Sequence, residues 1–503
     1  MGFVSKYRNE IIFCTIFITL YFLTRTFTLS QVPIFTDEAI YLRWAQYLQS
    51  DLKFWDYAVT DGKQPLFIWL MIPFLRIIED PLIAGRMVSV FAGFVTMIGL
   101  FFLGREVFKS RWVGLLSSAL YVIYPFALVY DRMALYDAVV GTFAVWGLYG
   151  SIYFIRNISL QNAMLLGVVT GAAVLNKTNG FFTIYMLPFL LLLFDWRVKN
   201  RVPRLIRFFA FAGVIVVMTY GIYYILRLSP YFYIITEKNA IFVYPVREWL
   251  SHPFLTIFSN TSALFDWLIH YFSLPFVVLV AYAFFYKERW REKLLLLGYF
   301  GAPLVALAFF GRTIYPRYIF FMTLSLLPLI AYSLRTLTLK RHTVVQMAIV
   351  FFSLIYPFYV SSYLLFDFPN SPIPLSDRSQ YYTAWPSGTG IQESIALFEK
   401  EAAKGPVYIA TQGTFGLLPY AYEVYLSNNP NVTIKGFWPI ERDLPSEIAE
   451  AAKVKKTYYV FYQDCTVCPA NGVAPPELPL EEVLEIKRLE KNSNFTVYEV
   501  IAK

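Results

Sequence analysis

Apolar runs close to 20 residues long recur along this 503-residue chain, and they restrict its fold more than any other feature. A helix needs about 20 apolar residues to cross a bilayer. The composition agrees, because 57% of the residues are hydrophobic, 15% are charged and the mean hydropathy is +0.52. A soluble chain would carry about 25% charged residues. The sequence therefore predicts a polytopic α-helical membrane protein.

About eleven runs are predicted to be membrane spans. They cover residues 10–30, 82–104, 112–130, 136–155, 162–176, 178–195, 208–226, 262–285, 294–310, 318–334 and 344–366. The first run follows the basic stretch "SKYR", and no small-residue cleavage site comes after it. We therefore expect a retained span and not a removed signal peptide.

Short basic loops orient the predicted spans. The stretches "SKYR", "GREVFKSR", "DWRVKNRVPRLIR", "YKERWREK" and "RTLTLKRH" all fall on one side of an eleven-span arrangement. The positive-inside rule makes that side cytoplasmic. The first loop at 31–81, the 227–261 loop, "GRTIYPR" and everything after about residue 367 are then extracytoplasmic. We expect a multi-pass protein of the cell membrane.

The first outer loop carries two apolar segments that are too short to span. In "EAIYLRWAQYL", one helical face is predicted to carry Ile40, Trp44, Tyr47 and Leu48, whereas Arg43 and Gln46 lie on the other. Such a helix suits the membrane surface. The segment at 65–78, "PLFIWLMIPFLRII", is predicted to be a second interfacial or re-entrant helix. Residues 31–81 would thus form a structured platform within a transmembrane domain spanning 1–366.

The C-terminal part, residues 367–503, has the composition of a soluble domain. "PVYIATQ", "VTIKGFW", "TYYVFYQD" and "FTVYEVIA" resemble strands, and "IQESIALFEKEAAK" and "LPSEIAEAAKVK" resemble amphipathic helices. This alternation predicts an outer-face α/β domain. Its "CTVC" motif, Cys465 to Cys468, has no second cysteine pair to complete a zinc site, so a local disulfide or two free thiols remain open.

Charged residues gather at the outer ends of the predicted spans. They are Asp37, Glu38, Lys63, Arg86, Arg132, Asp137, Lys177 and Arg317. Charges near hydrocarbon are costly and usually mark functional sites. Carboxylates can activate a hydroxyl, and lysine and arginine can hold a phosphate. The pattern indicates a polar cavity suited to moving a group from a lipid phosphate.

In order along residues 1–366, the motifs around these charges resemble the glycosyltransferase C superfamily. The likeness is to its protein O-mannosyltransferase and aminoarabinose-transferase branch. The matching motifs are Asp37-Glu38, "KQPL" with Gln64 in place of a proline, "RMALYDA", "LNKTNG" and "YPRYIFFMTLSLLP". The resemblance implies a polyprenyl- or dolichyl-phosphate sugar donor, an outward-facing site and inversion at the anomeric carbon.

The resemblance also implies roles for individual residues. Asp37 would be the general base that accepts the proton of the acceptor hydroxyl, supported by Glu38. Asp137 would orient the acceptor or hold Lys63 or Arg132 in place. The lipid phosphate would be bound by residues that carry or flank positive charge, namely Lys63, Arg132, Lys177, Tyr315 and Arg317.

Structural roles are the alternative for several of these residues. Thr36 or Asp37 could cap the platform helix, Arg86 could tether two helices, and Lys177 could cap a helix or extend to the interface. The three histidines form no predicted zinc site. No cofactor is expected to be obligatory, although paired acids could hold a divalent cation.

Two other classes of protein compete with a membrane glycosyltransferase. Intramembrane charges also occur in transporters and lipid flippases, but the two halves show no matching broken helices. A non-catalytic membrane scaffold would leave the converging charges unexplained. The sequence names neither the sugar nor the acceptor, which could be a protein, a lipid or a glycan. Nucleic acid is not an expected partner.

Overall fold

The structure is a computed structural model that describes residues 8–339 and 342–501. The predicted cytoplasmic residues Lys6, Lys340 and Arg341 lie outside the described residues. The chain forms two compact units. Unit 1 comprises residues 1–28, 55–70 and 86–374, and unit 2 comprises residues 29–54, 71–85 and 375–503. The expected division of the chain at residues 366 and 367 stays a prediction.

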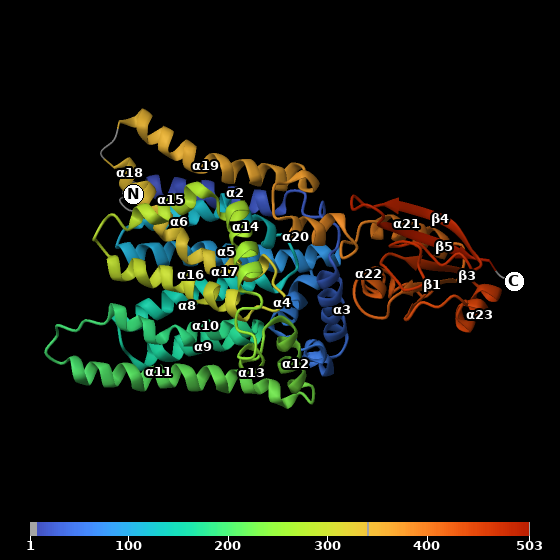
Figure 1. Cartoon of the computed structure of the whole chain (residues 1–503), viewed down its shortest axis with the longest axis horizontal. Coiled ribbons are helices and arrows are strands. Elements are labelled where there is room, and N and C mark those ends of the chain that lie inside the picture. Colours follow the sequence, from blue (N-terminus) through green and yellow to red (C-terminus); the bar gives the residue numbers. More distant parts are fainter. Residues whose placement is uncertain (1–7, 340–341, 502–503) are drawn as a thin grey trace. The chain divides into compact units, whose positions relative to one another are not determined.

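Unit 1 is built mainly from helices that run side by side (Figure 1). The α-helices from the N-terminus through residue 366, apart from α3, are α2 (Arg8–Thr26), α4 (Leu66–Leu75), α5 (Pro81–Phe108), α6 (Arg111–Ile123), α7 (Pro125–Tyr130), α8 (Tyr136–Arg156), α9 (Leu160–Asn176), α10 (Phe182–Tyr185), α11 (Arg201–Tyr223), α12 (Phe232–Phe242), α13 (Val246–Trp249), α14 (Ile257–Phe272), α15 (Leu274–Ala283), α16 (Trp290–Phe310), α17 (Arg317–Thr323), α18 (Leu327–Thr338) and α19 (Thr343–Phe366). Short 3₁₀ segments join them, including η1 (Leu52–Asp61), η2 (Thr178–Phe181), η3 (Leu187–Leu193), η4 (Tyr224–Leu228) and η5 (Leu324–Leu326).

Each of the eleven predicted spans is helical in the structure. Within the described residues, six helical segments are long and apolar enough to cross a membrane, and the pair α14 and α15, bent by 91°, would be a seventh. The other predicted spans fall on shorter helices such as α6 and α9. The polytopic helical architecture is confirmed, whereas the count of eleven stays a prediction.

Small residues let α9 pack closely against α11. A Cβ added at Gly167 would lie 2.9 Å from Cβ of Met218, and one at Gly171 would lie 2.3 Å from Cδ1 of Ile222. This spacing of two glycines four residues apart on an apolar helix is typical of membrane helix contacts. The packing fixes the end of α9, where Lys177 follows.

Unit 2 contains a five-stranded sheet with the order β2-β1-β3-β5-β4 (Figure 1). The strands are β1 (Val407–Gln412), β2 (Val432–Phe437), β3 (Lys456–Phe461), β4 (Leu480–Lys487) and β5 (Asn494–Val500). Strand β1 pairs in parallel with β2 and β3, and β5 pairs antiparallel with β3 and β4. The accompanying helices include α20 (Leu375–Arg378), α21 (Ile391–Ala402), α22 (Leu417–Leu426) and α23 (Ser446–Val454). The predicted α/β domain is confirmed.

Helix α3 (Thr36–Ser50) also belongs to unit 2. Three residues of its predicted apolar face, Ile40, Trp44 and Leu48, are buried. Tyr47 was wrongly placed on that face, because it is half-buried and its hydroxyl donates to Glu423 Oε2 at 3.1 Å. Its polar face contacts α22, because Arg43 Nε donates to Glu423 Oε2 at 2.8 Å and Gln46 Nε2 donates to the Val424 carbonyl at 2.9 Å. The helix was correctly predicted, and its polar face packs against protein.

Candidate active site

Four charged residues of unit 1 are held at the ends of helices. Asp137 is the second residue of α8, Lys177 directly follows α9, and Arg317 is the first residue of α17. Lys63 lies in the turn between η1 and α4. A carboxylate at a helix N-terminus and a cation at a helix C-terminus both interact favourably with the helix dipole, so Asp137 and Lys177 are well placed.

These residues form one cluster, which we call the cation cluster: Lys63, Asp137, Lys177 and Arg317. Lys177 Nζ donates to Asp137 Oδ1 at 2.8 Å. The Asp137 side chain is buried, whereas that of Lys177 is 29% exposed. Lys63 and Arg317 are both close enough to act electrostatically on Lys177. One buried carboxylate and three cations thus lie close together, and Lys177 bonds to the carboxylate.

Aromatic rings flank the cations. Lys177 Nζ lies 5.3 Å from the ring centroid of Tyr318. The guanidinium carbon of Arg317 lies 5.2 Å from the Tyr315 ring centroid and 6.0 Å from that of Tyr318. Cations over aromatic faces gain electrostatic stabilisation. The rings therefore position Lys177 and Arg317 through their aromatic faces and not through hydrogen bonds.

Gln64, the residue that departs from the family motif, connects three segments of the site. Its Nε2 donates to Thr178 Oγ1 at 2.7 Å, and its backbone carbonyl accepts from the Tyr136 hydroxyl at 2.8 Å. These bonds link the turn of Lys63 to the residues beside Lys177 and Asp137. A proline at this position would have no side-chain amide to make the first bond.

Helix α12 supports the same turn. Lys238 Nζ forms an ion pair with Asp61 Oδ1 at 2.7 Å, and Asn239 Nδ2 donates to Thr178 Oγ1 at 3.4 Å. Gly62 has a φ of +69°, and a Cβ there would lie 2.5 Å from Cβ of Lys238. Only glycine suits this close approach and left-handed backbone. The turn before Lys63 is therefore fixed by packing.

An apolar pocket is lined by residues that lie close in sequence to the cation cluster. Val140 comes three residues after Asp137 on α8, Asn179 comes two residues after Lys177, and residues of α9, α10, α16, α17 and η5 complete the lining. Its lining residues include Val140, Ala144, Asn179, Phe182, Tyr299 and Phe321. A charged cluster beside an apolar pocket can hold an amphipathic ligand with an anionic head.

Arg132 has a different environment. Its guanidinium donates to the backbone carbonyls of Phe27, Thr28 and Leu364 at 2.8 to 3.1 Å. These carbonyls lie at or just beyond the C-terminal ends of α2 and α19, where acceptors lack helical partners. Arg132 thus joins two helix ends, and its expected role in phosphate binding stays a prediction.

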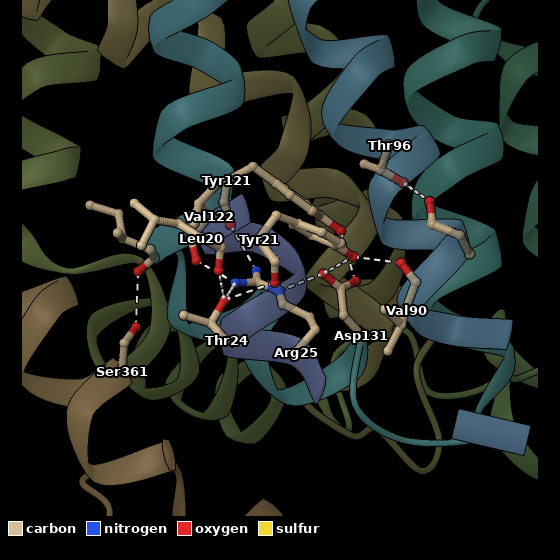
Figure 2. Close-up of polar contacts among 12 residues, drawn as sticks. Leu20, Tyr21, Thr24, Arg25, Val90, Thr96, Tyr121, Val122, Asp131 and Ser361 are labelled. Carbon is tan, nitrogen blue, oxygen red and sulfur yellow. Dashed lines mark hydrogen bonds and ion pairs between the residues drawn. The ribbon is translucent and has the colours of Figure 1, made fainter. Parts of the chain in front are cut away.

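The residue before Arg132 belongs to a buried polar network. Figure 2 shows Tyr21, Arg25, Tyr121 and Asp131 pointing toward one another. Asp131 accepts from the Tyr121 hydroxyl at 2.8 Å and the Tyr21 hydroxyl at 3.2 Å, and Arg25 Nε lies 3.3 Å from its Oδ2. A Cβ at Gly93 would lie 2.4 Å from Cγ of Asp131. The network ties α2, α5 and α6 to the segment that leads into Asp137.

Asp37 and Glu38 lie in unit 2, at the start of α3. Asp37 is half-buried, and Glu38 is fully buried. Glu38 Oε2 accepts from the backbone N–H of Phe35 at 3.0 Å, which satisfies a donor at the helix N-terminus. The structure thus gives Glu38 a part in holding the helix start on which Asp37 lies.

The sequence motifs led to a site role for Tyr315 but for none of Tyr318, Gln64 and Thr178. Tyr318 directly follows Arg317 in the quoted "YPRY" motif, and this adjacency was the available signal. The Gln64–Thr178 bond joins residues 114 positions apart. Local sequence carries no signal for such a contact.

Metal ligands do not gather in the described part of the chain, residues 8–339 and 342–501: no group of three His, Cys, Asp or Glu residues is placed to hold an ion. Tight protein sites for Ca²⁺ use several oxygen ligands, and Mg²⁺ sites commonly use one or two carboxylates. The expected possibility of a divalent cation stays a prediction.

Known proteins resemble this chain in sequence and in fold. Residues 62–223, which include Lys63, Arg132, Asp137 and Lys177, match the family model for dolichyl-phosphate-mannose-protein mannosyltransferase. No curated protein sequence matches the chain.

Solved structures resemble the whole chain. ArnT from Cupriavidus metallidurans bound to undecaprenyl phosphate is 14% identical, with a TM-score of 0.63 and 99% of each chain covered. The same protein in the apo state is 13% identical, with a TM-score of 0.60, and 99% of each chain is again covered. The archaeal oligosaccharyltransferase AglB from Archaeoglobus fulgidus is 11% identical, with a TM-score of 0.53. The match covers 91% of this chain and 70% of the AglB chain. The resemblance inferred from the motifs is confirmed, and the chain has the fold of the glycosyltransferase C superfamily.

Proposed function

We propose that this protein transfers one sugar from a polyprenyl- or dolichyl-phosphate donor to an acceptor hydroxyl on the extracytoplasmic face of a membrane. The observation that carries the proposal is the cation cluster beside an apolar pocket, within a glycosyltransferase C fold. The family model names a dolichyl-phosphate-mannose enzyme, and two similar structures hold undecaprenyl phosphate or dolichol-phosphate.

The cation cluster suits the leaving group of such a reaction. When the bond between the anomeric carbon and the phosphate oxygen breaks, the lipid phosphate leaves with the electron pair. Lys63, Lys177 and Arg317 would stabilise that charge, as positioned cations do for developing anions. Tyr315 would hold Arg317 over its ring. The apolar pocket would take part of the lipid chain.

A carboxylate is needed to activate the acceptor. The acceptor oxygen would attack the anomeric carbon from the face opposite the phosphate and invert it, while Asp37 accepts the hydroxyl proton. A general base contributes about 10²–10⁴-fold to rate. Asp137, paired with Lys177, would keep that cation oriented toward the phosphate.

Two observations support the extracytoplasmic orientation. The short basic loops all fall on one side of the predicted spans, which the positive-inside rule makes the cytoplasmic side. Cys465 and Cys468 of unit 2 form a disulfide, and disulfides persist in oxidising compartments outside the cytosol. The acceptor could be a protein, a lipid or a glycan.

The test measures transfer from a panel of radiolabelled polyprenyl-phosphate sugars in detergent, with membrane extract as the acceptor source. The variant Asp37→Asn keeps the size of the side chain and removes its charge at neutral pH. We expect wild-type transfer with one donor and a fall of about 10²–10⁴-fold in Asp37→Asn with donor binding retained. Transfer that survives in Asp37→Asn would exclude this base, and folded wild type inactive with every donor would count against the reaction.

A further inference from the structure

Three exposed aromatic side chains lie at the carboxyl ends of the parallel strands in unit 2. Trp438 directly follows β2 and is 51% exposed, Phe415 lies in the loop after β1 and is 48% exposed, and Trp385 is 39% exposed. Large aromatic residues gain free energy when they leave water, so exposed clusters usually mark binding surfaces. We call this group the aromatic rim.

Close backbone contacts place the segments that carry Phe415 and Trp438 at the same ends of their strands. The backbone N–H of Gly413 donates to the Phe437 carbonyl at 2.8 Å. A Cβ at Gly436 would lie 2.3 Å from the Gly413 carbonyl oxygen. The loop after β1 therefore lies directly against the end of β2. Carboxyl ends of parallel strands are where open α/β sheets bind ligands.

Tyr462, which follows β3, joins the third aromatic residue to these strand ends. The Trp385 ring centroid lies 6.3 Å from that of Tyr462. A Cβ at Gly413 would be 3.5 Å from the Tyr462 hydroxyl, and one at Gly416 would be 4.0 Å from it. The rim thus spans the ends of β2, β1 and β3.

The loops that carry the rim contain little charge, and the exposed charges Glu441, Arg442 and Asp443 begin directly after the third loop. The loops at 384–390, 413–416, 437–440 and 462–464 contain neither lysine nor arginine, and their one acid is Asp464. The nearby Arg442 lies 3.7 Å from Glu477. Amide and hydroxyl groups, such as Gln463 and Thr414, accompany the rings. Anionic lipid surfaces attract basic clusters, which these loops lack.

The rim adjoins the helix start that carries Asp37, within the same unit. Thr36 donates to the Pro386 carbonyl from its backbone N–H at 3.0 Å and from its hydroxyl at 2.8 Å. A Cβ at Gly416 would lie 3.8 Å from Cγ2 of Thr36. A molecule stacked on the rim would therefore extend toward Asp37, the next residue.

We infer that the aromatic rim binds the acceptor and that the acceptor is a neutral glycan. This inference rests on the proposed function, in which Asp37 activates an acceptor hydroxyl. A pyranose ring has a face of C–H groups, which stacks on an aromatic ring, and hydroxyls at its edge, which bond to amides and hydroxyls. An uncharged aromatic surface with neighbouring polar groups suits that chemistry. Trp438 and Phe415 determine which acceptor is used.

The experiment uses the full chain in nanodiscs and measures transfer to cello-, malto- and mannohexaose and to a peptide rich in serine and threonine. Trp438→Ala and Phe415→Ala are compared with a control, Val454→Ala. Val454 is 79% exposed and lies just before β3, at the opposite ends of the strands from the rim. We expect each rim variant to raise the KM for a glycan about 10-fold, as for aromatic anchors elsewhere. The kcat and donor affinity should stay within twofold, and Val454→Ala should match wild type.

Direct binding separates failure of this inference from failure of the proposed function. Hexaose binding by the wild type, measured by isothermal titration calorimetry and lost in Trp438→Ala, would support the rim even if no transfer occurs. An unchanged glycan KM in both rim variants would overturn it. So would an effect on the peptide alone. Spin-labelled lipid provides a further check. If it quenches the part of the tryptophan fluorescence that is present in wild type and absent in Trp438→Phe, the rim contacts the membrane instead.

Discussion

Two buried carboxylates, Asp131 and Asp137, lie six residues apart in unit 1 and have different surroundings. Asp131 is fully buried and accepts hydrogen bonds from two tyrosines and from Arg25, which is also fully buried (Figure 2). Asp137 pairs with Lys177, whose side chain is 29% exposed and lies near two further cations.

The difference separates a structural carboxylate from one suited to a site. The groups around Asp131 bond to one another and to backbone carbonyls, so a ligand could displace them only by leaving buried polar groups unpaired. Lys177 keeps solvent access, and among the described residues its side chain contacts Asp137 and the face of the Tyr318 ring. It can therefore turn a donor toward a phosphate at small cost.

The largest expected effect follows from breaking the first pair. Asp131→Ala leaves the fully buried Arg25 without its carboxylate, which typically costs about 3–5 kcal/mol. We expect a strongly lowered unfolding temperature in detergent, measured by the loss of monodisperse protein after heating. Asp137→Ala is the matched variant, because it removes the more accessible pair. Equal losses of stability in the two variants would contradict the comparison.

A smaller effect is expected for an ion cluster at the surface of unit 2. Glu401 accepts from Lys404 Nζ at 2.7 Å and from Lys456 Nζ at 3.0 Å. These hydrogen bonds lower the pKa of Glu401 below its usual 4.5. A carboxyl with a lowered pKa stabilises the fold at neutral pH, and that stabilisation is lost as the pH falls below 4.5 through the folded-state pKa.

The measurement for this cluster is hydrogen exchange of the β1 and β3 amides in the full chain between pH 6 and pH 3, corrected for intrinsic rates. Wild type should lose protection more steeply on acidification than Glu401→Gln, which has no carboxyl to titrate there. Identical pH dependence in the two proteins would show that the pairs contribute nothing to stability, as is common at surfaces.

Much of the architecture could be predicted from sequence because it depends on local patterns. Apolar runs predict helices, and alternating strands and helices predict the α/β domain. Strand β4 escaped prediction because four of its eight residues are charged, as is usual for an edge strand. Helix α22 was missed because it is short and its glycine-flanked, aromatic sequence has no clear amphipathic pattern.

The arrangement of the charges could be predicted only in part. Lys63, Asp137, Lys177 and Arg317 were four of the eight charges named from their shared position at span ends, and the structure brings these four together. The Arg25–Asp131 pair joins residues 106 positions apart, and its tyrosines come from two helices. Arg132 was assigned to phosphate because sequence alone does not reveal that helix-end carbonyls surround it.

The central claim is that the cation cluster binds a lipid phosphate. Its most direct test is the affinity of the purified protein for undecaprenyl phosphate, compared between wild type, Lys177→Met and Lys109→Met. Lys109, 47% exposed and paired with Glu106, is the control because it lies outside the cluster. We predict that Lys177→Met weakens binding about 10-fold or more, the size of a lost charged hydrogen bond, while Lys109→Met binds like wild type. Equal affinity in all three proteins would contradict the account.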